Sequence, residues 1–124
     1  MRFLLDTQVM LWWLLGDQRL RSETRQLMAT SACMISVASV WEVAIKHRTG
    51  KLSIDPMTFR DQSLAVGATL LPINDAHAIE TARLPGIHED PFDRLIIAQA
   101  RIERLMAVSS DGRWSHYSIA LQRP

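Results

Sequence analysis

Cysteine is nearly missing from this 124-residue sequence, and its scarcity excludes two common ways of stabilising a small domain. The single cysteine, Cys33, supports neither an internal disulfide framework nor a cysteine-based zinc site. Long apolar runs are missing too: the longest, residues 9–15, is far shorter than the roughly 20 residues of a membrane-spanning helix. The positive start and cleavage site of a signal peptide are also absent. We therefore expect a cytoplasmic protein with no membrane partner.

An excess of charge of either sign is absent as well. Fourteen Lys and Arg residues stand against thirteen Asp and Glu residues, and the net charge is +1, which excludes a polybasic protein that coats DNA. Only two of the basic residues, Lys46 and Lys51, are lysines. Arginine forks match both phosphate and carboxylate groups, so composition alone leaves RNA, a protein partner and water open. The length suits one domain, and we expect residues 1–124 to form it.

Short apolar runs alternate along the chain with longer helical patterns. Strands are expected at residues 3–5, 34–35, 68–73, 106–108 and 119–121. Helices are expected at residues 7–15, 22–30, 37–48, from 56 onward, 75–83 and 91–104, with Ser22, Ser36, Asp75 and Asp90 as N-caps. This alternation predicts an α/β fold of three layers, α/β/α, in which helices cover both faces of a central parallel sheet of about five strands.

Acidic residues follow two of the predicted strands. Asp6 comes directly after residues 3–5, and Asp111 comes soon after residues 106–108. Taken alone, Asp6 is interpreted as a helix N-cap and Asp111 as part of an Asp-Gly turn. Sites in parallel sheets form outside the carboxyl ends of the strands, so both positions are also candidates for a functional site.

Two further acids lie on predicted helices. Asp93 shares a helix face with Ile96 and Ile97, which directs its carboxylate toward the sheet, although an acid this close to a helix start is also favoured by the helix dipole. Glu42 precedes Lys46 by four residues, a spacing typical of a surface ion pair. Each acid therefore has a structural and a functional interpretation.

Considered together, the acids favour the functional interpretation. A parallel sheet would bring four of them to one crevice: Asp6, Glu42, Asp93 and Asp111. Clustered carboxylates repel one another unless they are protonated or bridged by a cation. Oxygen ligands without a Cys or His pattern suit Mg²⁺ or Mn²⁺ rather than zinc. Such a metal activates water for phosphodiester hydrolysis, which needs no protein nucleophile.

Four segments then carry a resemblance to a known family: Leu4–Thr7, Ser36–Lys46, His88–Ala100 and Val108–Asp111. With these segments in this order, the chain resembles PIN-domain proteins and is most similar to the VapC-type ribonuclease toxins of type II bacterial toxin–antitoxin systems. The resemblance covers essentially the whole chain, and its Asp-Pro-Phe-Asp-Arg segment is highly specific. It implies a PIN-like three-layer fold.

The resemblance also implies an activity and a set of partners. The activity is that of a Mg²⁺- or Mn²⁺-dependent endoribonuclease, in which the same four acids, Asp6, Glu42, Asp93 and Asp111, are catalytic and hold the metal. Thr7 and Ser109 would orient a carboxylate or a metal-bound water. Asp90 would hold such a water or only cap the helix, and Gln8 departs from the usual residue of the family. The implied partners are an RNA substrate, a small inhibitory antitoxin and a second copy of the chain in a homodimer.

Other residues allow two interpretations each. Lys46 and Arg48, together with Arg94 on the solvated helix face, are candidates for contacts with the RNA backbone, or they belong to ordinary solvated surfaces. His88 is interpreted as a loop histidine, with a metal ligand as the alternative. The pair Trp12 and Trp13 fits the core, with one of them free for a dimer or antitoxin contact.

Two alternatives to a toxin stay open at this point. One is a PIN-like nuclease of RNA processing or repair that has no antitoxin. The other is an RNA-binding module with a degenerate site, against which the presence of all four acids argues.

Overall fold

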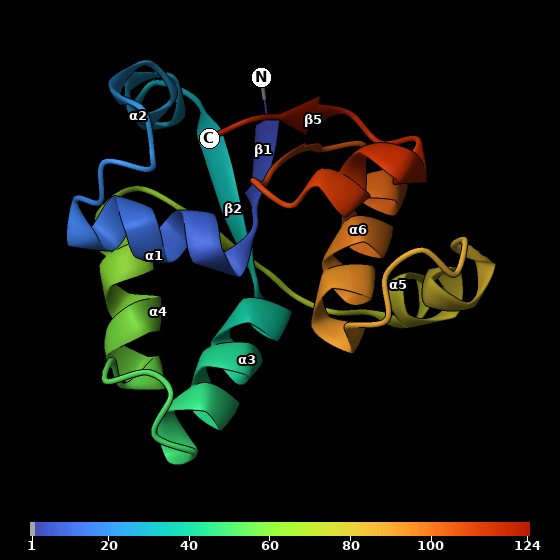
Figure 1. The fold of residues 1–124 in the computed structure, drawn as a ribbon, viewed down its shortest axis with the longest axis horizontal. Coiled ribbons are helices and arrows are strands. Elements are labelled where there is room, and N and C mark those ends of the chain that lie inside the picture. Colours follow the sequence, from blue (N-terminus) through green and yellow to red (C-terminus); the bar gives the residue numbers. More distant parts are fainter. Residues whose placement is uncertain (1) are drawn as a thin grey trace.

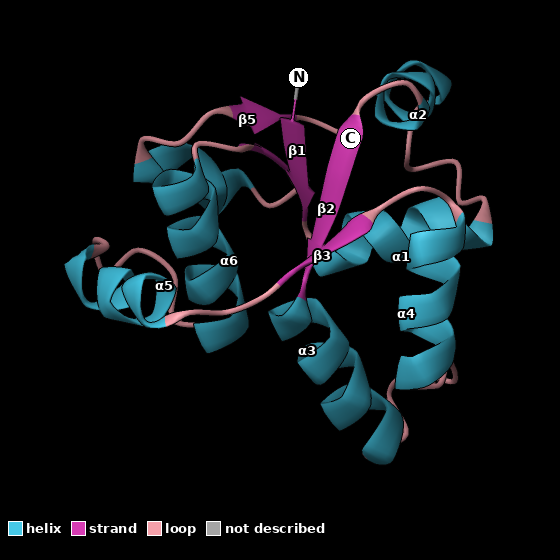
Figure 2. Cartoon of the chain, turned by 180° about the vertical axis from the view of Figure 1, so that it is seen from behind, coloured by secondary structure: helices cyan, strands magenta, loops and turns pink. Residues whose placement is uncertain are grey.

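A central parallel sheet organises the computed structural model, which describes residues 2–124 (Figures 1 and 2). Its strands are β1 (Arg2–Leu5), β2 (Ala32–Ser36), β3 (Thr69–Leu71), β4 (Met106–Val108) and β5 (Leu121–Gln122). They are arranged in the order β3-β2-β1-β4-β5, and every neighbouring pair is parallel. The predicted α/β class and the predicted parallel sheet are therefore confirmed.

Helices cover both faces of this sheet. They are α1 (Thr7–Leu15), α2 (Ser22–Ala29), α3 (Val37–Arg48), α4 (Pro56–Ala65), α5 (Asp75–Glu80) and α6 (Pro91–Glu103), with 3₁₀ turns η1 (Thr81–Arg83) and η2 (Gly112–Tyr117). In Figure 1, α1, α2 and α4 lie on one side of the strands, α5 and α6 lie on the other, and α3 extends from the carboxyl edge. None of the helices within residues 2–124 is long and apolar enough to cross a membrane.

The middle strand, β1, joins two hydrophobic cores because successive side chains of a strand point to opposite faces. Phe3 and Leu5 are fully buried in the core that α1 and α4 cover. Leu4 is fully buried in the other core, together with Ile96 of α6 and Trp114 of η2. Burial on both faces explains why the strand reads as a continuous apolar run rather than an alternating one.

Two of the predicted helix caps are wrong by one residue. Ser22 and Asp75 are the first residues of α2 and α5, and the N-cap positions belong to Arg21 and Asn74. The Asn74 side chain accepts a hydrogen bond from the backbone of His77, whose ring accepts one from the backbone of Asn74. This reciprocal arrangement is a capping box, and the sequence conceals it because histidine takes the place usually held by Glu or Gln.

The C-terminal third differs most from the prediction. The helix expected over residues 75–83 ends at Glu80 and continues as η1, and the strand expected at 119–121 is β5, which begins two residues later and ends one residue later. Residues 112–117, for which no element was predicted, form η2. This turn buries Trp114 and Tyr117 against α6, so tertiary packing rather than local pattern determines its conformation.

Candidate functional site

A polar cavity of about 220 Å³ opens at the carboxyl edge of the sheet, between the first turns of α1 and α6 and the later turns of α3. Three of the four predicted acids line it: Asp6, Glu42 and Asp93. Its remaining polar lining consists of Thr7, Gln8, Lys46, His88, Asp90 and Arg113. Asp111, the fourth acid, does not line the cavity directly and reaches it through contacts with His88 and Arg113.

Asp6 leaves the end of β1 and is held by the neighbouring strand. Its backbone N–H donates to the carbonyl of Val108, and one carboxylate oxygen accepts a hydrogen bond from Ser109 Oγ at 2.8 Å. Although Asp6 occupies the N-cap position of α1, its side chain makes no capping hydrogen bond, so the capping interpretation fails. Burial, reinforced by the negative charge of Asp93, raises the pKa of the Asp6 carboxyl to about 7.

Glu42 is buried on the inner side of α3 and is held by two neighbours. Thr7 Oγ1 donates to Glu42 Oε1 at 2.8 Å, and Lys46 Nζ lies 2.8 Å from Glu42 Oε2. Ser39 Oγ lies 2.8 Å from Thr7 Oγ1, so a chain of hydroxyl groups leads to the carboxylate. The predicted ion pair with Lys46 is present, yet Glu42 itself faces the cavity rather than the surface.

Asp93 lies in the first turn of α6 beneath the N-cap residue Asp90. The Asp90 side chain accepts hydrogen bonds from the backbone N–H groups of Phe92 and Asp93. Asp90 therefore caps the helix, which is one of the two roles expected for it. Partial burial, and then the nearby charge of Asp90, raise the pKa of Asp93 to about 6. The carboxylates that face the cavity are therefore costly to ionise in the absence of a cation.

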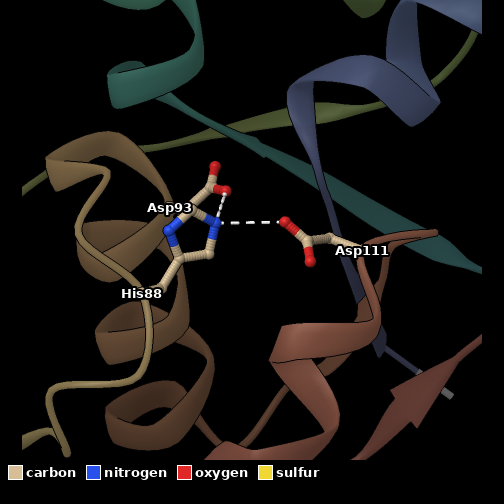
Figure 3. A group of neighbouring side chains, drawn as sticks. All are labelled: His88, Asp93 and Asp111. Atoms are coloured by element: carbon tan, nitrogen blue, oxygen red, sulfur yellow. Dashed lines mark hydrogen bonds and ion pairs between the residues drawn. The ribbon is translucent and has the colours of Figure 1, made fainter.

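His88 lies between Asp93 and Asp111 (Figure 3). Its Nε2 atom is 2.7 Å from Asp93 Oδ2 and 3.0 Å from Asp111 Oδ2, and the side chain is 5% exposed. Its backbone N–H donates to the hydroxyl of Tyr117. His88 therefore lies in a loop, as expected, but its ring is buried against two acids of the site, which the sequence did not indicate.

Arg113 was not predicted as part of the site. Its guanidinium contacts both oxygens of Asp111, with Nε 3.1 Å from Oδ1 and Nη2 2.9 Å from Oδ2, and its backbone N–H also donates to Oδ1. The Arg113 side chain is the main cause that lowers the pKa of Asp111 to about 2. Asp111 also acts as the turn residue expected from the Asp-Gly pair, because it caps η2.

The basic candidates for RNA contacts are placed differently from one another. Lys46 lines the cavity, whereas Arg48 lies exposed at the end of α3 and does not. Arg94 was expected on the solvated face of its helix, and this is wrong. Its guanidinium is half-buried and donates to four backbone carbonyls of the segment that leads to the site, those of Thr81, Leu84, Pro85 and His88. Arg94 therefore holds that segment in place.

Replacing Arg94 with alanine is expected to lower the free energy of unfolding by about 2–4 kcal/mol. The substitution leaves carbonyls without a charged donor, and hydrogen bonds to charged groups contribute roughly 1.5–3 kcal/mol each without full additivity. Urea denaturation followed by circular dichroism measures the change. Arg60→Ala, which alters an exposed arginine of α4, is the control. An Arg94→Ala protein as stable as the Arg60→Ala protein would contradict a structural role for Arg94.

The donor set of the cavity fits a hard divalent cation. Carboxylates converge there with raised pKa values, and their oxygens are the ligands that Mg²⁺ and Mn²⁺ prefer. Lys46 already contacts Glu42 and supplies one positive charge to the cavity, whereas a divalent cation would supply two. The arrangement is therefore suited to holding a divalent metal beside a phosphate group.

Comparison with a protein-family model identifies the fold. Residues 3–120 match the model of the PIN domain, which is nearly the whole chain. A comparison with curated proteins found no match.

Solved structures with the same fold agree with this assignment. The chain is similar to VapBC2 from Rickettsia felis bound to a promoter DNA fragment, with a TM-score of 0.78, 15% identity, and coverage of 99% of this chain and 98% of that one. It is similar to DNA-bound VapBC from Salmonella typhimurium, with a TM-score of 0.70, 19% identity, and coverage of 99% and 98%. FitAcB from Neisseria gonorrhoeae gives a TM-score of 0.67 at 18% identity, with coverage of 96% and 95%. At these identities the similarity is one of fold.

Proposed function

We propose, from the premise that this chain belongs to the PIN-domain family, that it is a Mg²⁺- or Mn²⁺-dependent endoribonuclease and the toxin of a toxin–antitoxin pair. PIN domains are nucleases. The observation that carries the proposal is the convergence of Asp6, Glu42 and Asp93 in one cavity, with Asp111 joined to them through His88.

In this proposal the four acids would hold a divalent cation, and the chemistry that such a cation would supply is activation of water and neutralisation of charge on the phosphate. Ser109 fixes one oxygen of Asp6 and leaves the other oxygen for the cation. Thr7 fixes Glu42 in the same way. These hydroxyl groups keep the carboxylates oriented, so that little rearrangement is needed when the cation and the substrate bind.

Two positive side chains at the cavity support an anionic substrate. Lys46 and Arg113 line the cavity and are balanced by Glu42 and Asp111 in the free protein. A cation held by those acids would release the two side chains to contact phosphate oxygens of the RNA backbone. Arg48 is exposed at the end of α3, two residues beyond Lys46, so it lies on another side of the helix and is left out of this proposed contact.

An apolar cleft next to the cavity supports a protein inhibitor. The cleft is about 140 Å³, and five aliphatic side chains line it: Leu11, Leu14, Leu15, Leu52 and Ile54. It shares Gln8, Leu11 and Leu52 with the acidic cavity, so a chain seated in the cleft would reach the acids. A solved structure with this fold, from Klebsiella pneumoniae, is a toxin–antitoxin complex, and we propose the same kind of assembly, with a homodimer of this chain.

The two adjacent tryptophans contribute to the core more than to such an interface. Trp12 is buried with Arg19 above its ring, and Trp13 packs half-buried against the same core. The exposed apolar residue of this helix is Leu15, at 74% exposure. We therefore place the antitoxin contact on the leucine side chains of the cleft.

A cleavage assay tests the proposed activity. The purified chain is incubated with a structured RNA and with a DNA of the same sequence, in Mn²⁺, in Mg²⁺ and in EDTA. We expect internal cleavage of the RNA that needs one of the two metals and stops in EDTA, with the DNA left intact. Cleavage that persists in EDTA would contradict the metal dependence. Co-expression with any small protein encoded beside this chain would then show whether such a protein abolishes the activity, as an antitoxin should.

A further inference from the structure

The imidazole of His88 has a fixed tautomer. Its Nδ1 atom lies 3.1 Å from the backbone nitrogen of Asp90, whose N–H donates to it. Because a backbone N–H only donates, Nδ1 accepts this bond and carries no hydrogen. The hydrogen-bond network therefore assigns the proton of the neutral ring to Nε2.

The opposite edge of the ring contacts the acids. Nε2–H donates to Asp111 Oδ2 at 3.0 Å, and Asp93 Oδ2 lies 2.7 Å from the same nitrogen (Figure 3). His88, Asp93 and Asp111 lie close enough together to resemble a three-residue metal site. A nitrogen that carries a proton offers no lone pair to a metal, however, so this geometry is that of a hydrogen-bond donor.

We infer that His88 is a positioning residue of the nuclease site, which orients Asp111 and sets its separation from Asp93, and is not a ligand of the cation. The inference rests on the proposed function, since it concerns how that site is arranged. It separates His88, as a hydrogen-bond donor, from Asp93 and Asp111, as proposed metal ligands, although the three lie close enough together to form one metal site.

The surrounding structure holds His88 firmly enough for this role. Its backbone N–H donates to the Tyr117 hydroxyl on η2, and its carbonyl accepts from Arg94 Nη1 at 3.3 Å. The backbone is thus anchored on both sides of the ring, and the ring itself is nearly completely buried. Turning Nε2 toward a metal would break the bond to the Asp90 backbone or the bond to Asp111.

The contacts also leave room for a cation. His88 contacts Oδ2 of Asp93 and Oδ2 of Asp111, and its contacts do not involve Oδ1 of Asp93. Groups that orient the ligands of a metal commonly change metal affinity by about 10- to 100-fold when they are removed. Loss of the His88 donor should therefore be visible in metal binding even though the ring makes no bond to the metal.

Electron–nuclear double resonance on the Mn²⁺-loaded wild-type protein tests the inference without any substitution. The spectrum is compared between protein of natural isotopic abundance and protein with ¹⁵N-labelled histidine. We expect no histidine nitrogen coupling to the bound Mn²⁺. A coupling that changes on histidine labelling, and that disappears in His88→Gln, would overturn the inference. Failure of the wild-type protein to bind Mn²⁺ would instead overturn the proposed metal-dependent nuclease itself, and the positioning role with it.

Two substitutions separate the donor from the ring. His88→Leu removes the donor, and we expect Mn²⁺ affinity to fall about 10- to 100-fold in calorimetric titrations. His88→Gln keeps an N–H donor, and we expect it to recover most of that loss. His116→Gln, at an exposed histidine of η2, is the matched control and should bind like the wild type. Wild-type affinity in a folded His88→Leu protein would overturn the inference. If His88→Leu does not fold, His88→Gln decides: a fall in its Mn²⁺ affinity of about 10- to 100-fold would overturn the inference.

Discussion

Replacing Asp93 with asparagine is expected to reduce RNA cleavage by at least about 100-fold while making the folded protein more stable. The loss of activity follows because the amide has no negative charge to hold the cation, and even residues that only support metal ligands change activity by about 10- to 100-fold. The gain in stability follows because the pKa of Asp93 is raised to about 6, so its ionised form opposes folding at neutral pH.

The two measurements are a cleavage rate in Mn²⁺ and a thermal melt of the metal-free protein at pH 8. Asp61→Asn, which neutralises an exposed acid of α4, is the matched control and should alter neither one by much. Unchanged cleavage by Asp93→Asn would remove Asp93 from the catalytic residues. A much lower melting temperature would show instead that its charge chiefly stabilises the start of α6 through the helix dipole.

The second large effect concerns pH. The metal-free protein is expected to lose stability as the pH rises from about 4 to about 7. The pKa of Asp6 is 3.8 in an unfolded chain and about 7 in the folded protein, so the folded state binds more protons within this interval. Since one pKa unit corresponds to about 1.36 kcal/mol, the loss attributable to Asp6 is on the order of 4 kcal/mol. Asp93, whose pKa is raised to about 6, adds to the loss in the same direction.

Chemical denaturation at a series of pH values measures this effect, with Asp6→Asn as the informative variant. The variant should match the wild type near pH 4 and exceed it in stability near pH 8. Mg²⁺ at 100 Kd should recover part of this loss for the wild type at pH 8, because a ligand that binds only the folded state stabilises it by about 2.7 kcal/mol at that concentration. A wild-type protein that is most stable at pH 8 without metal would contradict the electrostatic description of the cavity.

The sequence predicts the parts of the site that depend on topology. Asp6 follows an apolar strand, and Glu42 and Asp93 lie on helix faces that a parallel sheet turns inward; these three residues do line one cavity. Their placement depends on strand ends and helical periodicity, which are readable from local pattern. The capping role of Asp90 depends on local spacing in the same way.

The residues that the sequence misplaces are those whose role depends on contacts between distant segments. His88 meets Asp111 across 23 positions of the chain, and its backbone meets Tyr117 across 29. Arg94 occupies a helix position that periodicity assigns to solvent, but the segment before α6 folds back over it and supplies carbonyl acceptors. η2 escapes prediction for a related reason, since the burial of Trp114 and Tyr117 holds it together. No local pattern encodes such contacts.

The hydrogen bond between Ser109 and Asp6 has a consequence for the time at which the protein becomes active. The bond joins residues 103 positions apart, and β1, which carries Asp6, pairs with β4 near the other end of the chain. A nascent chain that has not yet extended to β4 therefore lacks the support for its first acid and leaves one edge of its central strand unpaired. Contacts of such long range form late in folding. A translation product cut short before β4 would therefore carry three of the acids and lack the proposed nuclease site.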